Sequence, residues 1–293
     1  MSVPVPRVSA VVVSYETRDD LLRCLGSLAR EPLLLETIVV DNASRDGSPE
    51  AVAAEHPGVR LLRNAANLGF GTACNQGIRL AGAPFALLLN SDAELRPGAL
   101  EALVERVGRE PDVGVAGPRT LNPDGSVQLS WGPKLSPLAE RRQRRLVRGV
   151  ARRDPAILAR VDAWSRAEAE PDWLSGSCLL ARIEALRGVG GFDEGFFLYE
   201  EDADLCLRLR HAGWRLVYTP RAEVVHRLGR SSAGDRGRAR LEYQRSHLRY
   251  YRKHCGPLAT AGLRLWLVAR GLLESFRAPD AGGALIGLGL RGH

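Results

Sequence analysis

The run VSAVVV, residues 8–13, is almost wholly apolar and rich in β-branched side chains. This composition is typical of a strand covered on both faces, as strands of a parallel sheet are. Stretches with helical spacing separate it from four more apolar runs, at residues 37–40, 59–62, 85–89 and 113–116. Because strand alternates with helix five times, we predict an α/β fold, a mostly parallel Rossmann-like sheet flanked by helices.

The pattern changes after residue 120. Residues 122–125 read NPDG, a predicted hairpin turn. Residues from about 132 to 170 are rich in Arg and Ala and weakly periodic, so we expect a variable insertion, part helix and part mobile loop. Two short strands, 215–218 and 222–225, should contribute to a small antiparallel part. Beyond residue 234 we predict amphipathic helices and a Gly-rich tail.

Charge is distributed unevenly along the 293 residues. The apolar fraction of 45% and charged fraction of 26% are ordinary for a globular protein, but the net charge is +7. Seven Arg lie within residues 141–153, and eight Arg with one Lys lie within residues 227–254. Arg enrichment can reflect genomic composition. Two local clusters also suit an anionic partner: a membrane surface, a phosphorylated substrate or nucleic acid.

Cysteine usage and hydropathy indicate the redox compartment of the protein and whether it spans a membrane. Five scattered cysteines without a CxxC pair argue against a zinc site or a disulfide framework and favour a reducing compartment. We find no signal-peptide pattern and no run of roughly 18 apolar residues, the length of a spanning helix. The best candidate, residues 258–276, is interrupted by Arg264 and Arg270. That segment could lie in a membrane interface or cover the core.

Residues 196–214 read FFLYEEDADLCLRLRHAGW, an aromatic run followed by the start of a predicted helix. Its first turn holds four acids: Glu200, Glu201, Asp202 and Asp204. Acids suit the first turn of any helix, so simple capping is the plain interpretation. Four carboxylates in five residues would, however, repel one another and raise some pKa values, as in catalytic bases. Of the four, Glu200 is the one we expect to be incidental.

Polar groups follow four of the predicted strands at their carboxyl ends, where ligands of open α/β sheets bind. They are Ser14-Tyr15, Asp41, residues 67–71 and residues 90–92. One polar residue at a strand end is usually a cap or a turn. Four at the same edge of one sheet are better explained by a ligand.

The type of ligand is narrowed by what these loops contain. The segment GFGTAC, residues 69–74, has Cys74 where the dinucleotide fingerprint needs its third Gly, and no P-loop occurs. The triplet NSD, residues 90–92, offers one carboxylate and a neutral oxygen. That set suits Mg²⁺ or Mn²⁺ already bound to a diphosphate. His226 also ends a strand and is either a further metal ligand or a structural histidine.

Seven motifs occur in the order found in the bacterial family 2 glycosyltransferases. The chain resembles their rhamnosyltransferase-like branch over about residues 8–232. This resemblance implies a GT-A fold and an inverting transfer from a nucleotide-diphosphate sugar. The motifs are VVVSYE, IVVDNAS, NLGFGTACNQG, LLLNSDAEL, WLSGSCLLAR, GGFDEGFFLYEEDADLCLRLRHAGW and VVHRLGRSS.

The resemblance also implies a domain division. Residues 1–232 would form the catalytic domain, with a nucleotide-binding half (1–120) and an acceptor and catalytic half (121–232) that carries the insertion. Residues 233–293 would form a helical extension.

Site residues are transferred from the resemblance position by position. Glu201-Asp202 matches the family's catalytic motif, in which the Asp is the general base. Asp92 stands at the metal motif, whose first acid is Asn90 here, and His226 matches the histidine that often completes the metal shell. The remaining matches would bind the nucleotide sugar: Ser14, Tyr15, Asp41 and Asn42 around the base, Asn67, Gly69 and Asn75 along the nucleoside and diphosphate, Asn90 and Ser91 beside the metal, and Trp173 and Gly176 beside the donor sugar and acceptor.

The predicted function is therefore transfer of a sugar, best matched by rhamnose from dTDP-rhamnose, onto a glycan or lipid-linked acceptor, with Mg²⁺ or Mn²⁺. The expected place is the cytoplasm, at the inner face of the membrane, with peripheral contact through the basic C-terminal helices. Nucleic acid is not expected, because an aromatic fraction of 6% offers few stacking platforms.

Three alternatives were weighed. A UDP-hexose transferase of the same fold is the second candidate after the rhamnosyltransferase. A non-catalytic nucleotide-sugar-binding regulator is disfavoured because Asp41, Asp92, Asp202 and His226 are all present. A sugar nucleotidylyltransferase needs a Gly-rich loop after the first strand, where this chain has SYETRDD.

Overall fold

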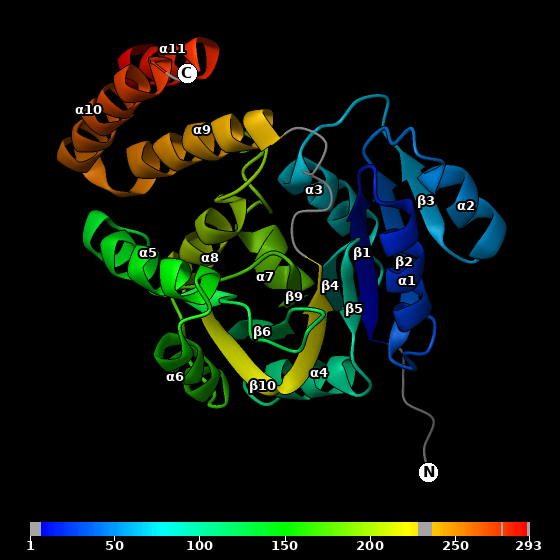
Figure 1. Ribbon diagram of the computed structural model, residues 1–293. Coiled ribbons are helices and arrows are strands. Elements are labelled where there is room, and N and C mark those ends of the chain that lie inside the picture. Colours follow the sequence, from blue (N-terminus) through cyan, green and yellow to red (C-terminus); the bar gives the residue numbers. More distant parts are fainter. Residues whose placement is uncertain (1–6, 228–235, 277, 292–293) are drawn as a thin grey trace.

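An eight-stranded sheet forms the centre of the computed structural model, which describes residues 7–227, 236–276 and 278–291 (Figure 1). Its strands follow the order β3-β2-β1-β4-β9-β6-β10-β5, and β7 and β8 form a separate two-stranded sheet. The strands are β1 (Val8–Ser14), β2 (Leu34–Asp41), β3 (Arg60–Arg63), β4 (Phe85–Asn90), β5 (Ala93–Leu95), β6 (Val113–Leu121), β7 (Trp131–Gly132), β8 (Trp173–Leu174), β9 (Cys178–Arg182) and β10 (Arg215–His226).

The sheet is mostly parallel, as the sequence predicts. β1 pairs in parallel with β2 and β4, β2 with β3, and β6 with β10. β9 is inserted antiparallel between β4 and β6, and the short β5 is antiparallel to β10. The five predicted N-terminal strands are all present, and β5 was not predicted because three residues carry too little periodicity.

Helices cover both faces of the sheet, which explains why β1 is buried along its whole length. On one face Val8, Ala10 and Val12 pack with side chains of α1, α2 and α4. On the other face Val11 and Val13 pack with α3, α7 and α8. The helices are α1 (Arg18–Leu28), α2 (Ser48–Glu55), α3 (Phe70–Leu80), α4 (Ala99–Gly108), α5 (Pro137–Ala151), α6 (Pro155–Ser165), α7 (Ile183–Gly188), α8 (Glu201–His211), α9 (Arg236–His254), α10 (Gly256–Ser275) and α11 (Pro279–Arg291).

Three sequence expectations were wrong in detail. Residues 215–226 form one strand, β10, and not two, because residues 220–222 bulge out of the pairing with β6 without ending the strand. The insertion is chiefly two helices, α5 and α6. Each starts with a Pro in its first turn and an N-cap side chain, Ser136 or Asp154, that accepts backbone N–H groups. The Gly-rich tail is the helix α11.

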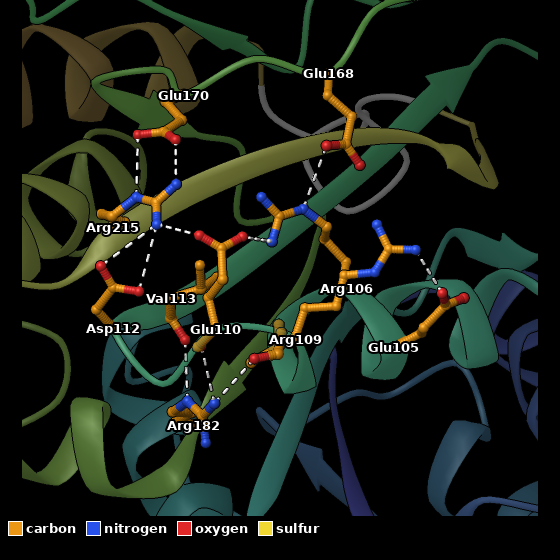
Figure 2. Close-up of polar contacts among 11 residues, drawn as sticks. Glu105, Arg106, Arg109, Glu110, Asp112, Val113, Glu168, Glu170, Arg182 and Arg215 are labelled. Carbon is orange, nitrogen blue, oxygen red and sulfur yellow. Dashed lines mark hydrogen bonds and ion pairs between the residues drawn. The ribbon is translucent and has the colours of Figure 1, made fainter.

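An ion-pair network ties the end of the insertion to the amino end of the last parallel strands (Figure 2). Arg215, the first residue of β10, contacts Glu170, Glu110 and Asp112. Arg106 of α4 contacts Glu110 and, at 3.3 Å, Glu168. These contacts fix both ends of the loop that follows α4 and the segment that follows α6.

The C-terminal helices pack against α8. Phe196, Ala203 and Leu207, in and before α8, share a core with Leu248 of α9 and Leu267 of α10. Figure 1 shows α9 lying across the end of the molecule, with α10 and α11 stacked beyond it. No helix in the described ranges is long and apolar enough to cross a membrane. The predicted boundary at residues 232 and 233, and residues 228–232 of the last motif, lie outside the described residues.

Candidate active site

Three of the four predicted strand-end groups lie at one edge of the sheet, together with His226. β1 ends at Ser14, β2 at Asp41 and β4 at Asn90, and these strands run in parallel. β9 is antiparallel to both β4 and β6, so β6 and its parallel neighbour β10 run in the same direction as β4. β10 therefore brings His226 to the same edge.

Asp41 offers a buried carboxylate oxygen with no partner. The residue is 2% exposed, and its Oδ2 accepts the backbone N–H of Ser44 at 2.9 Å. Its Oδ1 is buried and has no hydrogen-bond partner. A buried acceptor left unpaired is costly, so this atom is suited to accept an N–H group from a ligand.

Asn42 and Gly69 join the neighbouring loop to this edge. The backbone N–H of Asn42 donates to Ser14 O at 2.8 Å, and its Nδ2 donates to Gly69 O at 3.2 Å. Gly69 has φ +86°, and a Cβ there would lie 2.3 Å from Phe197 O. Only glycine fits, because the backbone passes against the segment that precedes the acidic helix. Asn67 accepts the Gly69 N–H through Oδ1 at 3.0 Å.

Two other predicted nucleotide residues differ in their surroundings. Tyr15 is half-buried beside Ser14, whose side chain is fully buried. Asn75 is buried in α3, and its amide makes protein contacts at both ends. Its Nδ2 donates to Phe192 O at 2.9 Å and to Glu194 Oε1 at 3.0 Å, and its Oδ1 accepts Phe192 N–H at 2.8 Å. In this structure Asn75 positions the loop that leads to the acidic helix.

Asp92 and His226 face each other beside Asn90. His226 Nε2 lies 3.1 Å from Asp92 Oδ1 and 3.3 Å from Asn90 Nδ2, and Asp92 is 3% exposed. His226 Nδ1 lies 3.1 Å from Gln128 Oε1. Gln128 donates through Nε2 to His226 O and to Asn122 Oδ1, so its Oε1 must accept. The proton of a neutral His226 therefore sits on Nδ1, and the Nε2 lone pair faces Asp92.

These groups fit a divalent cation shared with a ligand. Asp92 Oδ1 has no hydrogen-bond partner although His226 Nε2 is near, so two lone-pair donors stand side by side. A cation between them would relieve that arrangement. No cluster of three His, Cys, Asp or Glu side chains able to hold a metal occurs in the described residues. The set therefore suits a metal whose other ligands are phosphate oxygens.

Ser91 and Asn90 connect the Asp92 and His226 pair to the end of β1 and to the segment before β9. Ser91 Oγ lies 2.8 Å from Thr17 Oγ1, which in turn lies 3.4 Å from Ser14 Oγ. The Asn90 N–H donates to Ser177 O at 3.0 Å. Residue 176, next to Ser177, contacts the acidic helix.

Asp202 is held by two backbone N–H groups at the start of α8. Gly176 N–H donates to Oδ2 at 2.9 Å, and Ala203 N–H donates to Oδ1 at 2.7 Å. Burial raises the pKa of Asp202 to about 6, although these two hydrogen bonds oppose the shift. At neutral pH the carboxylate is mostly ionised yet able to take a proton, which is the property of a general base.

Glu201 differs from its neighbour. It is 6% exposed, and its Oε2 is buried without a partner. Burial, and then the negative charge of Asp202, raise the pKa of Glu201 well above its usual range. This favours the protonated form, so the pair divides into an acid and a base.

Asp204 and Glu200 are anchors to α9. Asp204 is fully buried and contacts Arg208 Nε and His254 Nε2, each at 2.7 Å. Glu200 Oε1 lies 3.0 Å from His247 Nδ1. Glu200, which the sequence suggests is incidental to the chemistry, is buried and occupies the N-cap position of α8, so its contacts in this structure are structural.

His247 forms the centre of a buried polar group between α5, α8 and α9. Its Nε2 lies 3.2 Å from Glu140 Oε2, and Tyr251 donates to Glu140 Oε1 at 2.5 Å. Burial alone would favour the neutral ring. The hydrogen bonds with Glu140 and Glu200 nevertheless raise the pKa of His247 to about 9, so the ring is a cation at neutral pH.

Trp173 precedes Gly176 in the chain and belongs to β8 of the two-stranded sheet. It pairs with Gly132 of β7, and its indole Nε1 is buried without a partner. Beyond it, an apolar groove of about 450 Å³ lies between the β7 segment and the helices α5 and α6. The groove reaches the site through Gln128, and its lining includes Leu129, Trp131, Leu138, Leu146, Val161 and Trp164.

Three residues that support this site were not predicted from the sequence. Thr17 contacts the predicted residue Ser91, Gln128 contacts the predicted residue His226, and His247 contacts Glu200, each across a long distance along the chain. None stands in a recognisable motif. His247 lies within the Arg-rich segment 227–254, whose charge favours contact with an anionic partner and does not indicate a buried role.

Comparison with known proteins assigns the class. The family model for Glycosyl transferase family 2 matches residues 9–160, and that for Glycosyl transferase family group 2 matches residues 86–279. A mannosyltransferase from Pyrobaculum calidifontis, solved with GDP-Man and Mn²⁺, aligns with a TM-score of 0.60 and 19% identity, over 98% of this chain and 87% of its own. GalNAc-T7, solved with UDP, GalNAc and Mn²⁺, aligns with a TM-score of 0.56 and 16% identity, over 76% and 43% of the two chains.

The protein has the GT-A fold, and the chain belongs to glycosyl transferase family 2. A more similar relative is the N-acetylglucosaminyl-diphospho-decaprenol L-rhamnosyltransferase of Mycobacterium tuberculosis. It is 38% identical over 248 residues, 77% of each chain. The predicted family, fold and enzyme class are thereby confirmed, and the chain is a glycosyltransferase of the rhamnosyltransferase-like branch.

Proposed function

We propose that the protein is an inverting rhamnosyltransferase. It would move rhamnose from dTDP-rhamnose onto a hydroxyl of a lipid-diphosphate-linked glycan during cell-surface polysaccharide synthesis. The similar mycobacterial relative is named for transfer of L-rhamnose to a decaprenol-diphosphate acceptor, which supports both substrates. The observation that carries the proposal is a half-buried carboxylate, Asp202, joined by backbone hydrogen bonds to the edge that bears Asp92 and His226.

Asp202 is the proposed general base. An acceptor hydroxyl is a poor nucleophile, so its proton must be removed as the oxygen attacks the anomeric carbon. Asp202 Oδ1 and Oδ2 each keep a lone pair beyond the N–H groups that orient them. A single displacement opposite the leaving diphosphate inverts the anomeric centre. Protonated Glu201 would keep a second negative charge away from Asp202.

Asp41 is proposed to bind the nucleotide base. Its free Oδ1 can accept the ring N–H of thymine or uracil, while Ser44 N–H holds Oδ2. Ser14, Tyr15 and Asn42 would complete this pocket. Asn67 and Gly69 bring the next loop close enough to contact the nucleoside and diphosphate.

Asp92 and His226 are proposed to hold Mg²⁺ or Mn²⁺, with Asn90 and Ser91 beside it. When bound, the metal would neutralise the charge that develops on the departing diphosphate. Gln128 fixes the His226 ring so that Nε2 is available as a ligand. Both structural neighbours were solved with Mn²⁺, which supports a divalent metal.

The apolar groove is the proposed place for the lipid part of the acceptor. Its wall includes Gly132, which pairs with Trp173, and Trp131, which pairs with Leu174. Lys134 and Arg142 line the same groove and could meet the diphosphate. An acceptor of this kind lies in a bilayer, so the enzyme would work at the cytoplasmic face of the membrane.

A thermal-shift panel with dTDP-rhamnose, UDP-glucose and GDP-mannose, each with and without Mn²⁺, tests the donor. We expect a metal-dependent rise in Tm with dTDP-rhamnose alone, and loss of that rise in Asp41→Ala. A rise with UDP-glucose instead would indicate a UDP-hexose transferase. Stabilisation without any transfer to a lipid-linked acceptor would favour a non-catalytic regulator, and no shift with any donor would contradict the proposal.

A further inference from the structure

The outward face of α10 carries a continuous apolar stripe. Its large side chains are strongly exposed: Leu258 88%, Leu265 72%, Leu272 55%, Leu273 72% and Phe276 89%. The spacing is that of one helix face. We name this surface the α10 stripe; it consists of Leu258, Ala261, Gly262, Leu265, Ala269, Leu272, Leu273 and Phe276, all exposed and none charged.

The α10 stripe stands on a firmly packed support. The opposite side of α10 buries Leu263, Leu267 and Gly271. A Cβ at Gly271 would lie 2.8 Å from Gly282 O, so α11 packs directly against the α10 backbone there. The buried side of α10 is therefore already packed against α11. The α10 stripe faces away from that contact, and its side chains are exposed.

Arginine borders the α10 stripe. The guanidinium groups of Arg144 and Arg270 each lie over the Trp266 ring, at 5.5 and 5.0 Å from its centre. Arg141 and Arg148 are exposed and share the Arg144 face of α5 by helical spacing. An apolar stripe edged by a Trp and by Arg is the arrangement of helices that lie in a membrane interface.

We propose that the α10 stripe lies in the headgroup region of an anionic bilayer, with the Arg border contacting lipid phosphates. This deepens the proposed function by naming the surface that brings the enzyme to a membrane-held acceptor. The 20 residues of α10 form a helix about 30 Å long. In the proposed position this helix lies parallel to the bilayer surface. The helix is not apolar enough to cross, since no membrane span is found in the described ranges.

A second copy of the chain is the competing occupant, and charge disfavours it. The net charge is +7, and the stripe is bordered on one side by the basic helix α5, whose single acid, Glu140, is buried. Two such borders brought together would repel each other. An anionic lipid surface would instead neutralise them, as polybasic segments require.

Vesicle co-sedimentation of the full chain tests the proposal without any transfer reaction. We expect binding to phosphatidylcholine vesicles that contain phosphatidylglycerol, weaker binding without it, and release by salt. Leu272→Glu should weaken binding about tenfold, because a charge replaces a leucine that would insert among the lipid headgroups. The matched control Leu35→Glu adds the same charge at a leucine that is 53% exposed outside the stripe, and should bind like the wild type.

Two results would overturn the proposal. One is equal vesicle binding by Leu272→Glu and the wild type. The other is a wild-type dimer in sedimentation velocity that Leu272→Glu converts to a monomer, with no vesicle binding by either. Donor-induced thermal stabilisation should be the same in wild type and variant, so failure here is distinguishable from failure of the donor assignment.

Discussion

Two adjacent carboxylates at the start of α8 differ in their preference for the charged form because their surroundings differ. Asp202 receives two backbone N–H groups, which stabilise its charge. Glu201 receives no side-chain partner at Oε2 and lies beside the charge of Asp202. Burial acts on both residues, so hydrogen bonding decides which of them is ionised. The charge of the proposed base therefore depends on the position of Gly176 N–H as well as on the Asp202 carboxylate itself.

The pH dependence of transfer should report Asp202. With a pKa of about 6, the residue is ionised above that pH and protonated below it. We expect kcat to fall about tenfold for each pH unit below 6 and to be flat toward neutral pH. Asp202→Asn should lower kcat by about 10²–10⁴ while donor binding, measured by thermal shift, is kept. An Asp202→Asn enzyme with normal turnover would refute this assignment.

Gln128 should determine how well the proposed metal ligands are oriented. Gln128→Leu removes the acceptor for His226 Nδ1, so the ring can rotate or change tautomer. We expect the Mn²⁺ concentration for half-maximal activity to rise about 10- to 100-fold, with kcat recovered at high metal. Gln143→Leu, a change in the same groove without contact to His226, is the control. An unchanged metal requirement in Gln128→Leu would contradict this role.

Several of the site residues that could be predicted from the sequence lie at the ends of strands. Asp41, Asp92 and His226 follow strands of a parallel sheet, and that topology alone brings them to one edge. Gln128 and His247 act on residues 98 and 47 positions away, respectively. Such pairs depend on tertiary packing, which periodicity and local propensity do not encode.

Among the elements, α9 acts as a brace for the catalytic turn. Tyr199 and Glu200 both have positive φ, at 70° and 65°, a strained conformation for non-glycine residues. Two α9 side chains hold this turn: Ser246 Oγ donates to Leu198 O at 2.8 Å, and His247 contacts Glu200. The C-terminal helices therefore help to place Asp202, although none of their residues was predicted to belong to the site.

The stability provided by this brace should depend on pH. The pKa of His247 is about 9 in the folded protein, against 6.5 for a free imidazole. Its charge therefore stabilises the fold fully below pH 6.5, and this contribution is lost as pH rises through 9. Over that interval the contribution is about 3 kcal/mol.

Urea unfolding of wild type and His247→Gln checks this prediction. The difference in free energy of unfolding between them should be largest at pH 6.5 and shrink toward pH 9. A difference that is constant with pH would mean that His247 acts only by packing. The variant should also lose turnover more than donor affinity, since the turn that carries Asp202 is affected.

The strands and helices that were predicted correctly differ from those that were not in how far tertiary packing determines them. The five apolar runs of the first half became strands because each is bounded by helices that cover it. β10 continues through a bulge because its pairing with β6 resumes at Glu223. The Gly-rich segment became α11 because its glycines allow close packing on α10, which offsets their low helix propensity.

In the whole molecule, the candidate site and the main ion-pair network lie at opposite edges of the sheet. The carboxyl ends of β1, β2, β4 and β10 carry the site, whereas the amino ends of β6 and β10 are joined by the Arg215 and Arg106 network (Figure 2). The network also fixes Glu168 and Glu170, which end the insertion. The helices α5 and α6 are thereby anchored at the body while their apolar groove stays accessible.

This arrangement predicts that the groove controls the acceptor and not the donor. Leu138 lies at the mouth of the groove and is 62% exposed, so Leu138→Asp should fold normally. We expect KM for a polyprenyl-diphosphate-linked acceptor to rise about tenfold, because a charge replaces an apolar contact with the lipid. Transfer to a short-chain soluble acceptor should not change.

Val147→Asp is the matched control, because Val147 is on the same helix, is 49% exposed and does not line the groove. If both variants raise KM alike, the effect is only the added charge on α5 near an anionic membrane. If Leu138→Asp alone raises KM, and only for the long-chain acceptor, the lipid enters between α5, α6 and the β7 segment. The sugar at its head is then presented to Asp202 from the side of Trp173, which pairs with Gly132 in the groove wall.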